Sequence, residues 1–169
     1  MKILITGICG FVGSSLASQL LKRYSELELF GLDNFIRPGS ELNRKQLTAA
    51  GVKLFHADIR NASDLEVLPE VDWVIDAAAN PSVLAGVDGK TSSRQLVEHN
   101  LSGTINMLEF CKRVAAGFIL LSTSRVYSIP GIANLEVEVA EGAYRPVASQ
   151  AFASGISSAG VSEAYSTQA

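Results

Sequence analysis

Five short apolar segments alternate with helix-like segments over the first 122 residues, and this alternation limits the possible folds most strongly. Short runs that are apolar on both faces are typical of strands in a parallel sheet that helices cover on both sides. Right-handed crossovers then produce a doubly wound sheet. The sequence predicts an α/β fold of about five strands with helices on both faces. The predicted strands are Lys2–Thr6, Glu28–Leu32, Val52–Ala57, Val71–Ala78 and Gly117–Ser122.

The segments between these strands carry apolar residues at the three- and four-residue steps of amphipathic helices. Ser40 and Asn61 are predicted to cap two short helices, and Gly51 is predicted to end the first of them. The predicted helices start at Gly10 or cover Glu41–Ala50, Ser63–Leu68 and Ser92–Ala115. In the longest helix, one apolar stripe is formed by Val97, Leu101, Ile105, Leu108, Cys111 and Ala115.

This pattern fades after Ser124. The last 23 residues, Val147–Ala169, contain six alanines, six serines and two glycines but only one charged residue. Such a composition predicts an irregular surface loop or tail. We therefore expect one α/β domain over residues 1–124 and an extension over residues 125–169. The fifth strand would form an open edge of the sheet.

Composition narrows the range of partners. The net charge of −3 gives no electrostatic reason to expect binding to nucleic acid or to an anionic membrane. Cys9 and Cys111 are too few for a disulfide framework, and neither has a metal-type spacing. No run of about 18 apolar residues predicts a membrane span, and the amino terminus does not resemble a signal peptide. A reduced, cytoplasmic setting is therefore expected.

The segment Thr6–Gly13, which reads TGICGFVG, carries the chemical signal of the sequence. A glycine-rich turn between a first strand and a first helix lets the backbone approach a pyrophosphate at the helix amino terminus. In this pattern Gly7 permits the tight turn, Gly10 the approach of the phosphate, and Gly13 the close packing of helix on strand.

Asp33 supplies the acidic residue that this motif requires. It lies 20 residues beyond Gly13, at the end of the second predicted strand. A carboxylate there accepts hydrogen bonds from the adenosine ribose diol and repels a 2′-phosphate, which favours NAD over NADP. Arg37 is close enough in sequence to weaken that preference. The alternative is a glycine turn and a loop aspartate that bind no ligand.

The TGxxGxxG spacing resembles the extended short-chain dehydrogenase/reductase family, which comprises NAD-dependent sugar-nucleotide epimerases and dehydratases. Within that family the chain is most similar to the CDP-paratose (CDP-tyvelose) 2-epimerase-like branch. The resemblance covers essentially the whole chain. It implies a Rossmann-like fold, NAD as cofactor and a nucleotide sugar as the substrate of the complete enzyme. A homodimer is a further possibility.

Further segments match motifs of the family. Asp58-Ile59-Arg60 resembles a segment whose aspartate meets the adenine amino group and whose next residue packs on the ring. Asn100 falls in a helix that resembles NxxGTxNLLE. Thr123 falls on the catalytic Ser/Thr position, although it is alternatively a plain strand-end hydroxyl. The resemblance implies cofactor contacts from Gly7, Cys9, Gly10, Phe11, Val12, Gly13, Asp33, Asn34, Asp58, Ile59, Ala77, Ala78, Ala79 and Asn100.

The chain also departs from the family pattern. None of its four tyrosines is followed four residues later by lysine, so the catalytic Tyr-x-x-x-Lys pair is absent. The tail up to Thr167 resembles the stretch just upstream of that pair, and the chain has roughly half the length of a complete member. Ser128 stands where the family has glycine.

These features leave three functional hypotheses. The first is the NAD-binding portion of a sugar-nucleotide epimerase or dehydratase that works by transient hydride transfer to NAD and is inactive alone. The second is a non-catalytic NAD-binding regulatory module. The third is an obligate partner that pairs through the open edge of its fifth strand. Which nucleotide sugar is used, and whether it is epimerised, dehydrated or reduced, does not follow from these residues.

Other polar residues receive ordinary structural interpretations. His56 and His99 are expected to be packed or surface residues, and no metal site is predicted. The Cys9 thiol is expected to be a small filler within the turn rather than a nucleophile. Asp76, in the fourth predicted strand, is given no role.

Overall fold

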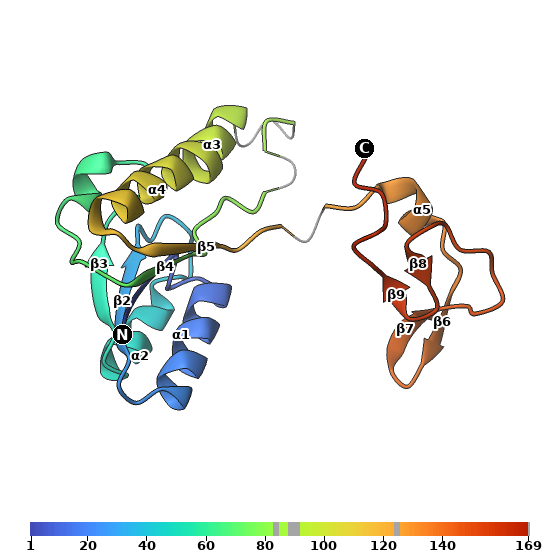
Figure 1. Cartoon of the computed structure of the whole chain (residues 1–169), viewed down its shortest axis with the longest axis horizontal. Coiled ribbons are helices and arrows are strands. Elements are labelled where there is room, and N and C mark those ends of the chain that lie inside the picture. Colours follow the sequence, from blue (N-terminus) through green and yellow to red (C-terminus); the bar gives the residue numbers. More distant parts are fainter. Residues whose placement is uncertain (83–84, 88–91, 124–125, 169) are drawn as a thin grey trace. The chain divides into compact units, whose positions relative to one another are not determined.

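The computed structural model describes residues 1–82, 85–87, 92–123 and 126–168 of the 169-residue chain. The chain forms two compact units, Met1–Leu121 and Ser122–Ala169. The first unit is a five-stranded parallel sheet in the order β3-β2-β1-β4-β5, with helices on both faces (Figure 1). This confirms the predicted Rossmann-like α/β fold. The strands are β1 (Lys2–Thr6), β2 (Glu28–Asp33), β3 (Lys53–His56), β4 (Trp73–Asp76) and β5 (Gly117–Leu120).

The strand order reverses at the central strand β1. The central strand β1 pairs with β2 on one side and with β4 on the other, so Thr6 lies opposite both Leu32 and Asp76. The chain moves outward from β1 to β3 and then returns to the other side of β1. Ligands of such sheets bind beyond the carboxyl ends of the strands, at the point where the strand order reverses.

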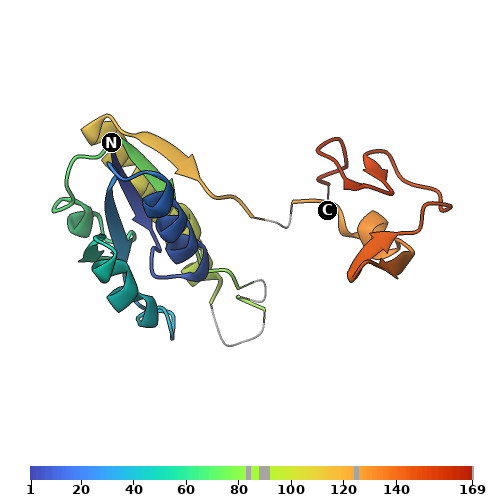
Figure 2. The same ribbon diagram turned by 90° about the horizontal axis from the view of Figure 1, so that it is seen from below.

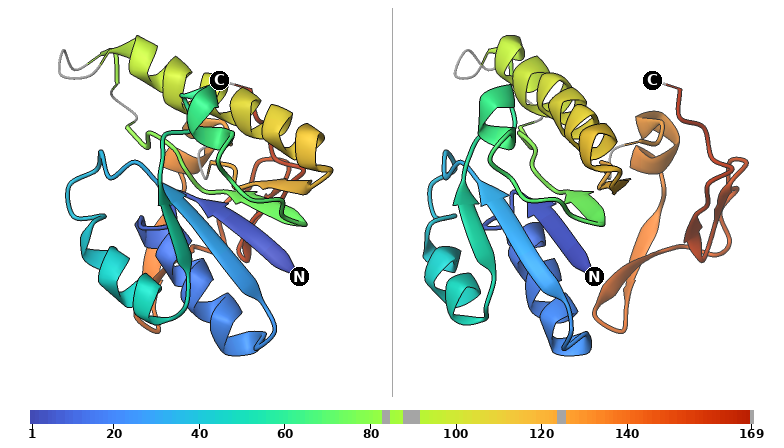
Figure 3. Two further views of the ribbon diagram at one scale, coloured as in Figure 1. Left: turned by 90° about the vertical axis from the view of Figure 1, so that its left-hand side faces the viewer. Right: turned by 60° about the vertical axis from the view of Figure 1, so that its left-hand side comes forward.

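The two faces of the sheet carry separate apolar cores because neighbouring residues of a strand point to opposite faces. Ile3 and Ile5 belong to the core under α1 (Phe11–Arg23) and α2 (Leu42–Ala49). Leu4 belongs to the core on the opposite face. That face is covered by η1 (Ala62–Leu65) and α4 (Gly103–Val114). The segments that lead into α4, α3 (Ser93–Val97) and η2 (Glu98–Ser102), contain no buried residue. Helices lie on both faces of the sheet in Figures 2 and 3.

The long helix predicted over Ser92–Ala115 is present as the continuous run α3–η2–α4, with a π-helical turn in its middle. The Ser92 side chain caps it by accepting a hydrogen bond from the Gln95 amide. Its buried face differs from the predicted stripe, since most of the stripe is about half exposed. The buried residues of α4 are Gly103, Met107, Phe110 and Cys111. No helix in the described ranges is long and apolar enough to cross a membrane.

Two predicted helix caps are wrong. The Ser40 hydroxyl donates to the carbonyl of Arg37 instead, and α2 begins two residues later without a side-chain cap. The side-chain amide of Asn61 donates to the Asp64 carboxylate, and no described side chain caps the 3₁₀ turn η1. In both cases the side chain hydrogen-bonds to a neighbouring polar group and therefore does not cap the helix. The predicted end at Gly51 is confirmed, because this glycine has a φ of +93°.

The second unit confirms the irregular stretch predicted from Val147, whose described residues contain only two strands of two residues each, but it is more regular before Val147 than the predicted extension. It contains a short helix and two small antiparallel hairpins. In the first hairpin, Glu141 and Gly142 both have positive φ (53° and 78°), as a two-residue turn matched to strand twist requires. The predicted boundary between residues 124 and 125 lies outside the described residues. The elements are α5 (Ile129–Ala133), β6 (Val137–Ala140), β7 (Ala143–Pro146), β8 (Ile156–Ser157) and β9 (Gly160–Val161).

The two ends of the second unit are tied together. The Ser128 amide donates to the carbonyl of Ser166 at 2.9 Å. The hydroxyl of Tyr165, which is 7% exposed, donates to the carbonyl of Ser128 at 3.3 Å. The ring of Tyr165 also packs against Tyr127, with 6.0 Å between the ring centroids. The chain between residues 128 and 166 therefore begins and ends at the same place.

Candidate functional site

The glycine turn between β1 and α1 is packed too closely for side chains. Gly7 has a φ of +58°, and a Cβ atom on it would lie 2.9 Å from the Cα of Ala78. A Cβ on Gly13 would lie 2.4 Å from the carbonyl oxygen of Gly7. The first contact brings the end of β4 against the turn, and the second seats α1 on it. These packing roles agree with those predicted for the first and third glycines.

The amino terminus of α1 is open to a ligand. Gly10 is its N-cap residue, no side chain in the described residues caps it, and its first turn contains no acidic residue. The first amides of a helix lack partners within the helix and lie at the positive end of its dipole. The side chains of Phe11 and Val12 beside them are 87% and 49% exposed. An anionic group is therefore stabilised here by geometry and by charge.

The Asp33 carboxylate lies at the glycine turn. One oxygen accepts the Cys9 amide at 2.9 Å, and the other accepts the Phe35 amide at 2.8 Å. Asp33 is only 8% exposed, so these two bonds fix the orientation of its carboxylate. Each carboxylate oxygen keeps a lone pair for a further donor. The structure thus joins the predicted acidic residue directly to the predicted phosphate-binding turn.

Cys9 is a structural residue of this turn. Its side chain is fully buried, and burial, reinforced by the negative charge of Asp33, raises the pKa of the thiol to about 11. The thiol therefore stays protonated at neutral pH and is a poor nucleophile. The side-chain amide of Asn43, a contact that the sequence analysis missed, donates to the Cys9 carbonyl at 2.8 Å.

A second polar group links the ends of β2 and β3. The Asp58 carboxylate accepts the Arg60 guanidinium at 2.6 Å and the Asn34 side-chain amide at 2.9 Å. The hydrogen bond from Arg60 holds the pKa of Asp58 well below its usual range, although burial opposes it. Ile59 between them is 5% exposed and belongs to the core, where its side chain packs on Gly103.

The ends of β1 and β4 are joined by a network that the sequence analysis missed. The Thr6 hydroxyl bonds to the Asp76 carboxylate and accepts the amides of Ala77 at 3.1 Å and Ala78 at 3.0 Å. The Thr104 hydroxyl of α4 lies 3.2 Å from the other carboxylate oxygen and also 3.2 Å from the Asn100 carbonyl oxygen, so these two acceptors share its one proton. The available signal was a carboxylate that ends an otherwise apolar strand.

Asn100 closes the loop that follows the three alanines. Its side chain accepts the Asn80 amide at 2.7 Å and donates to the Asn80 carbonyl at 3.1 Å. The π-helical turn η2 carries Asn100 at this position. Ala79, between the two tied regions, is exposed. Asn100 thus holds the backbone beside the predicted site, and its direct contact with a cofactor stays a prediction.

Thr123 belongs to the second unit, where it is exposed. Its neighbours in the STSRVY segment, Ser124 and Arg125, lie outside the described residues. The predicted catalytic role of Thr123 therefore stays a prediction.

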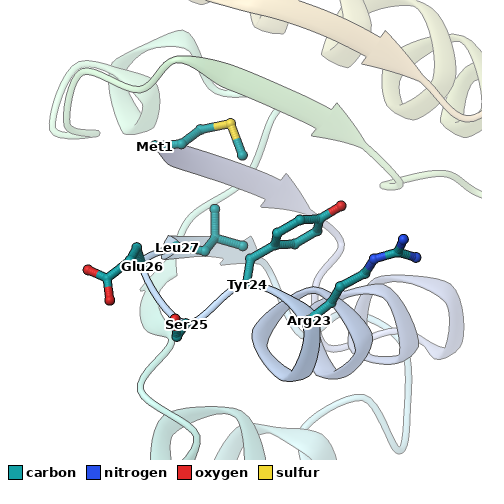
Figure 4. Close-up of a pocket in the computed structure, with 6 residues that line it drawn as sticks. All are labelled: Met1, Arg23, Tyr24, Ser25, Glu26 and Leu27. Atoms are coloured by element: carbon teal, nitrogen blue, oxygen red, sulfur yellow. The ribbon is translucent and has the colours of Figure 1, made fainter.

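A surface hollow of about 350 Å³ lies elsewhere on the first unit (Figure 4). It is formed at the amino ends of β1 and β2, whereas the glycine turn lies beyond their carboxyl ends. It therefore does not belong to the candidate site. The hollow is lined by Met1, Arg23, Tyr24, Ser25, Glu26 and Leu27.

Comparison with known proteins identifies clear relatives. The sequence profile of the NAD dependent epimerase/dehydratase family matches residues 3–149. CDP-paratose 2-epimerase of Salmonella typhi is 33% identical over 135 residues, which cover 75% of this chain and 38% of that protein. UDP-glucuronic acid decarboxylase 1 of Arabidopsis thaliana is 34% identical over 130 residues, which cover 77% of this chain and 28% of that protein.

Solved structures show the same likeness. UDP-glucuronic acid 4-epimerase from Bacillus cereus, in complex with NAD, is 34% identical, with a TM-score of 0.62 over 76% of this chain and 42% of that one. The UDP-Glc/GlcNAc 4-epimerase of Campylobacter jejuni is 26% identical, with a TM-score of 0.68 over 86% of this chain and 43% of that one. This chain thus spans less than half the length of each of these relatives.

Proposed function

Because this chain belongs to the NAD-dependent epimerase/dehydratase family, we propose that its first unit binds NAD as the cofactor-binding portion of a sugar-nucleotide epimerase or dehydratase. The hydrogen bond from the Cys9 amide to Asp33 carries this proposal. It holds the carboxylate that we assign to the ribose beside a helix amino terminus that no described side chain caps. These are the two groups that a dinucleotide requires at the reversal of strand order.

Different residues of the first unit bind different parts of the cofactor. The amides of the first turn of α1 hold the diphosphate, and the glycines keep side chains out of its path. Asp33 accepts the hydroxyls of the adenosine ribose through its remaining lone pairs. Asp58 and Asn34 border the adenine, although Asp58 shares its oxygens with Arg60. Bound NAD supplies the acceptor for a hydride from the sugar.

The catalytic proposal reaches further than cofactor binding. We assign Thr123 the role of orienting the reacting sugar oxygen, by its position in the family motif. A hydroxyl of this kind does not replace a tyrosine base, whose pKa near 10 needs a neighbouring cation to fall toward neutrality. The 169 residues contain no Tyr-x-x-x-Lys pair, so the proposed activity of this chain alone is cofactor binding without turnover.

The same missing pair favours a second candidate function, a non-catalytic NAD-binding regulatory module. The two proposals differ in what the gene encodes. A reading frame that continues past Ala169 into Tyr-x-x-x-Lys supports the enzyme portion, whereas a stop codon there supports the module.

Titration of the chain with NAD by calorimetry tests the proposed cofactor site. We expect Asp33→Asn and Asp33→Ala to weaken NAD binding by about tenfold or more, because each removes charged acceptors for the ribose diol. Glu26→Ala, which removes a carboxylate at the opposite end of the sheet, serves as the matched control and should bind like the wild type. A wild-type chain that releases no heat with NAD would refute the proposal.

A further inference from the structure

Asp76 is a buried carboxylate to which the proposed function gives no part. It ends β4 at the carboxyl edge of the sheet, and only 1% of it is exposed. A buried carboxylate is costly unless hydrogen bonds satisfy it. The Thr6 hydroxyl of β1 donates to Asp76, and the Thr104 hydroxyl of α4 shares its proton between Asp76 and the Asn100 carbonyl. One side chain thus connects two strands and a helix.

The bonds of Thr6 determine where its proton lies. Its hydroxyl accepts the amides of both Ala77 and Ala78, which occupies its two lone pairs. Its one proton is therefore donated to the Asp76 carboxylate. Asp76 is what keeps this hydroxyl turned with its lone pairs toward the two amides.

Those two amides begin the segment on which the glycine turn rests. A Cβ on Gly7 would lie 3.0 Å from both the Ala77 carbonyl oxygen and the Ala78 nitrogen. The backbone of Ala77–Ala78 therefore lies directly against Gly7, with no room for a side chain between them. Asn100 holds the far end of the same segment through Asn80. The backbone from residue 76 to residue 80 is thus fixed at both ends.

We propose that Asp76 is a positioning residue for the dinucleotide. Through Thr6 and Thr104 it fixes Ala77–Ala79 against the glycine turn and so sets the surface on which the cofactor lies. This inference rests on the proposed function, because it takes the glycine turn to be the NAD site.

Two substitutions at Asp76 test whether its hydrogen bonds, rather than the size of its side chain, are needed for NAD binding. Asp76→Val keeps a branched side chain suited to a strand but removes both acceptors. Asp76→Asn keeps one carbonyl acceptor for Thr6 and presents an amide to Thr104. We expect Asp76→Val to weaken NAD binding by about tenfold and Asp76→Asn to restore it to within about threefold of the wild type. Asp72→Val, just before β4, is the control and should bind normally.

Amide hydrogen exchange of Ala77 and Ala78 without NAD gives a second readout. Both amides should exchange faster in Asp76→Val and near the wild-type rate in Asp76→Asn. If Asp76→Val does not fold, the pair Thr6→Val and Thr6→Ser decides, because the hydrogen bonds of the Thr6 hydroxyl described above all belong to this network. Serine, which keeps the hydroxyl, should bind NAD like the wild type, and valine should bind it less tightly.

The failures are distinguishable. A wild-type chain that binds no NAD overturns the proposed function, and this inference falls with it. A wild type that binds NAD while Asp76→Val binds equally well overturns this inference alone. Equal weakening by Asp76→Val and Asp76→Asn also overturns it, because rescue by the amide is what positioning requires.

Discussion

Asp33 and Asp76 are both carboxylates that end strands, yet only one of them was recognisable from the sequence. Asp33 follows a glycine motif at a spacing with a known physical meaning, so its place beside the turn was predicted. Asp76 has no such motif around it. Its importance depends on Thr6 and Thr104, which lie 70 and 28 positions away in sequence and come together only in the folded sheet.

The pair of Asp58 and Arg60 predicts how stability depends on pH. The pKa of Asp58 is lowered in the folded state, so its stabilising contribution is complete above the unfolded pKa near 4 and is lost as the pH falls below it. We expect Asp58→Asn to lower the free energy of unfolding by about 1 kcal/mol at pH 7. The difference from the wild type should shrink toward pH 2.

Urea unfolding of both proteins between pH 2 and pH 7 measures this difference. Asp72→Asn, which alters an exposed carboxylate outside the network, is the control. A difference between Asp58→Asn and the wild type that stays constant across this range would contradict the assignment.

Elements with one buried face were predictable, and elements without one were not. The five strands were located within a few residues because their short apolar runs alternate with helical patterns. Of these strands, however, only β1 and β2 are buried on both faces, and the edge strands β3 and β5 are partly exposed. The β6–β7 hairpin lacks such contrast, since Val139 and Tyr144 are 71% and 79% exposed. Its conformation depends on the turn at Glu141 and Gly142. The π-helical turn η2 was also missed, because an apolar period does not report one extra residue in a turn.

The hairpin turn supports a prediction at the scale of one element. Gly142 has a φ of +78°, a conformation in which a β-branched residue is strained. We expect Gly142→Val to destabilise the hairpin by about 1–2 kcal/mol and to speed amide exchange across β6 and β7. Ala143→Val, at the adjacent extended position, is the matched control and should leave exchange nearly unchanged. Equal exchange in the two variants would show that the turn does not hold the hairpin.

For the whole molecule, the activity of the family has to be distinguished from what the residues of this chain can do. The family comprises NAD-dependent epimerases and dehydratases, but this chain covers 38% of its Salmonella typhi relative and holds no Tyr-x-x-x-Lys pair. Fold and cofactor class were therefore predictable from the first unit. The identity of the sugar and the net reaction could not be predicted, because no motif in this chain contains residues that determine them.

This difference predicts the behaviour of the purified chain. With NAD and a CDP-sugar, we expect no epimerised product above background, since a threonine hydroxyl without a tyrosine base does not remove the sugar proton efficiently. Chromatography of the nucleotide sugars, with an active full-length relative as positive control, provides the measurement. Product formed in proportion to the concentration of this chain would disprove the expectation.

The meeting of Ser128 and Ser166 has a consequence for how such chains diversify. Where the first and last residues of a segment are neighbours, exposed loops within the segment can change length without displacing the chain on either side of it. Exposed turns between these two serines can therefore change length, whereas Gly131 and Gly155 are held by their close packing on Tyr165.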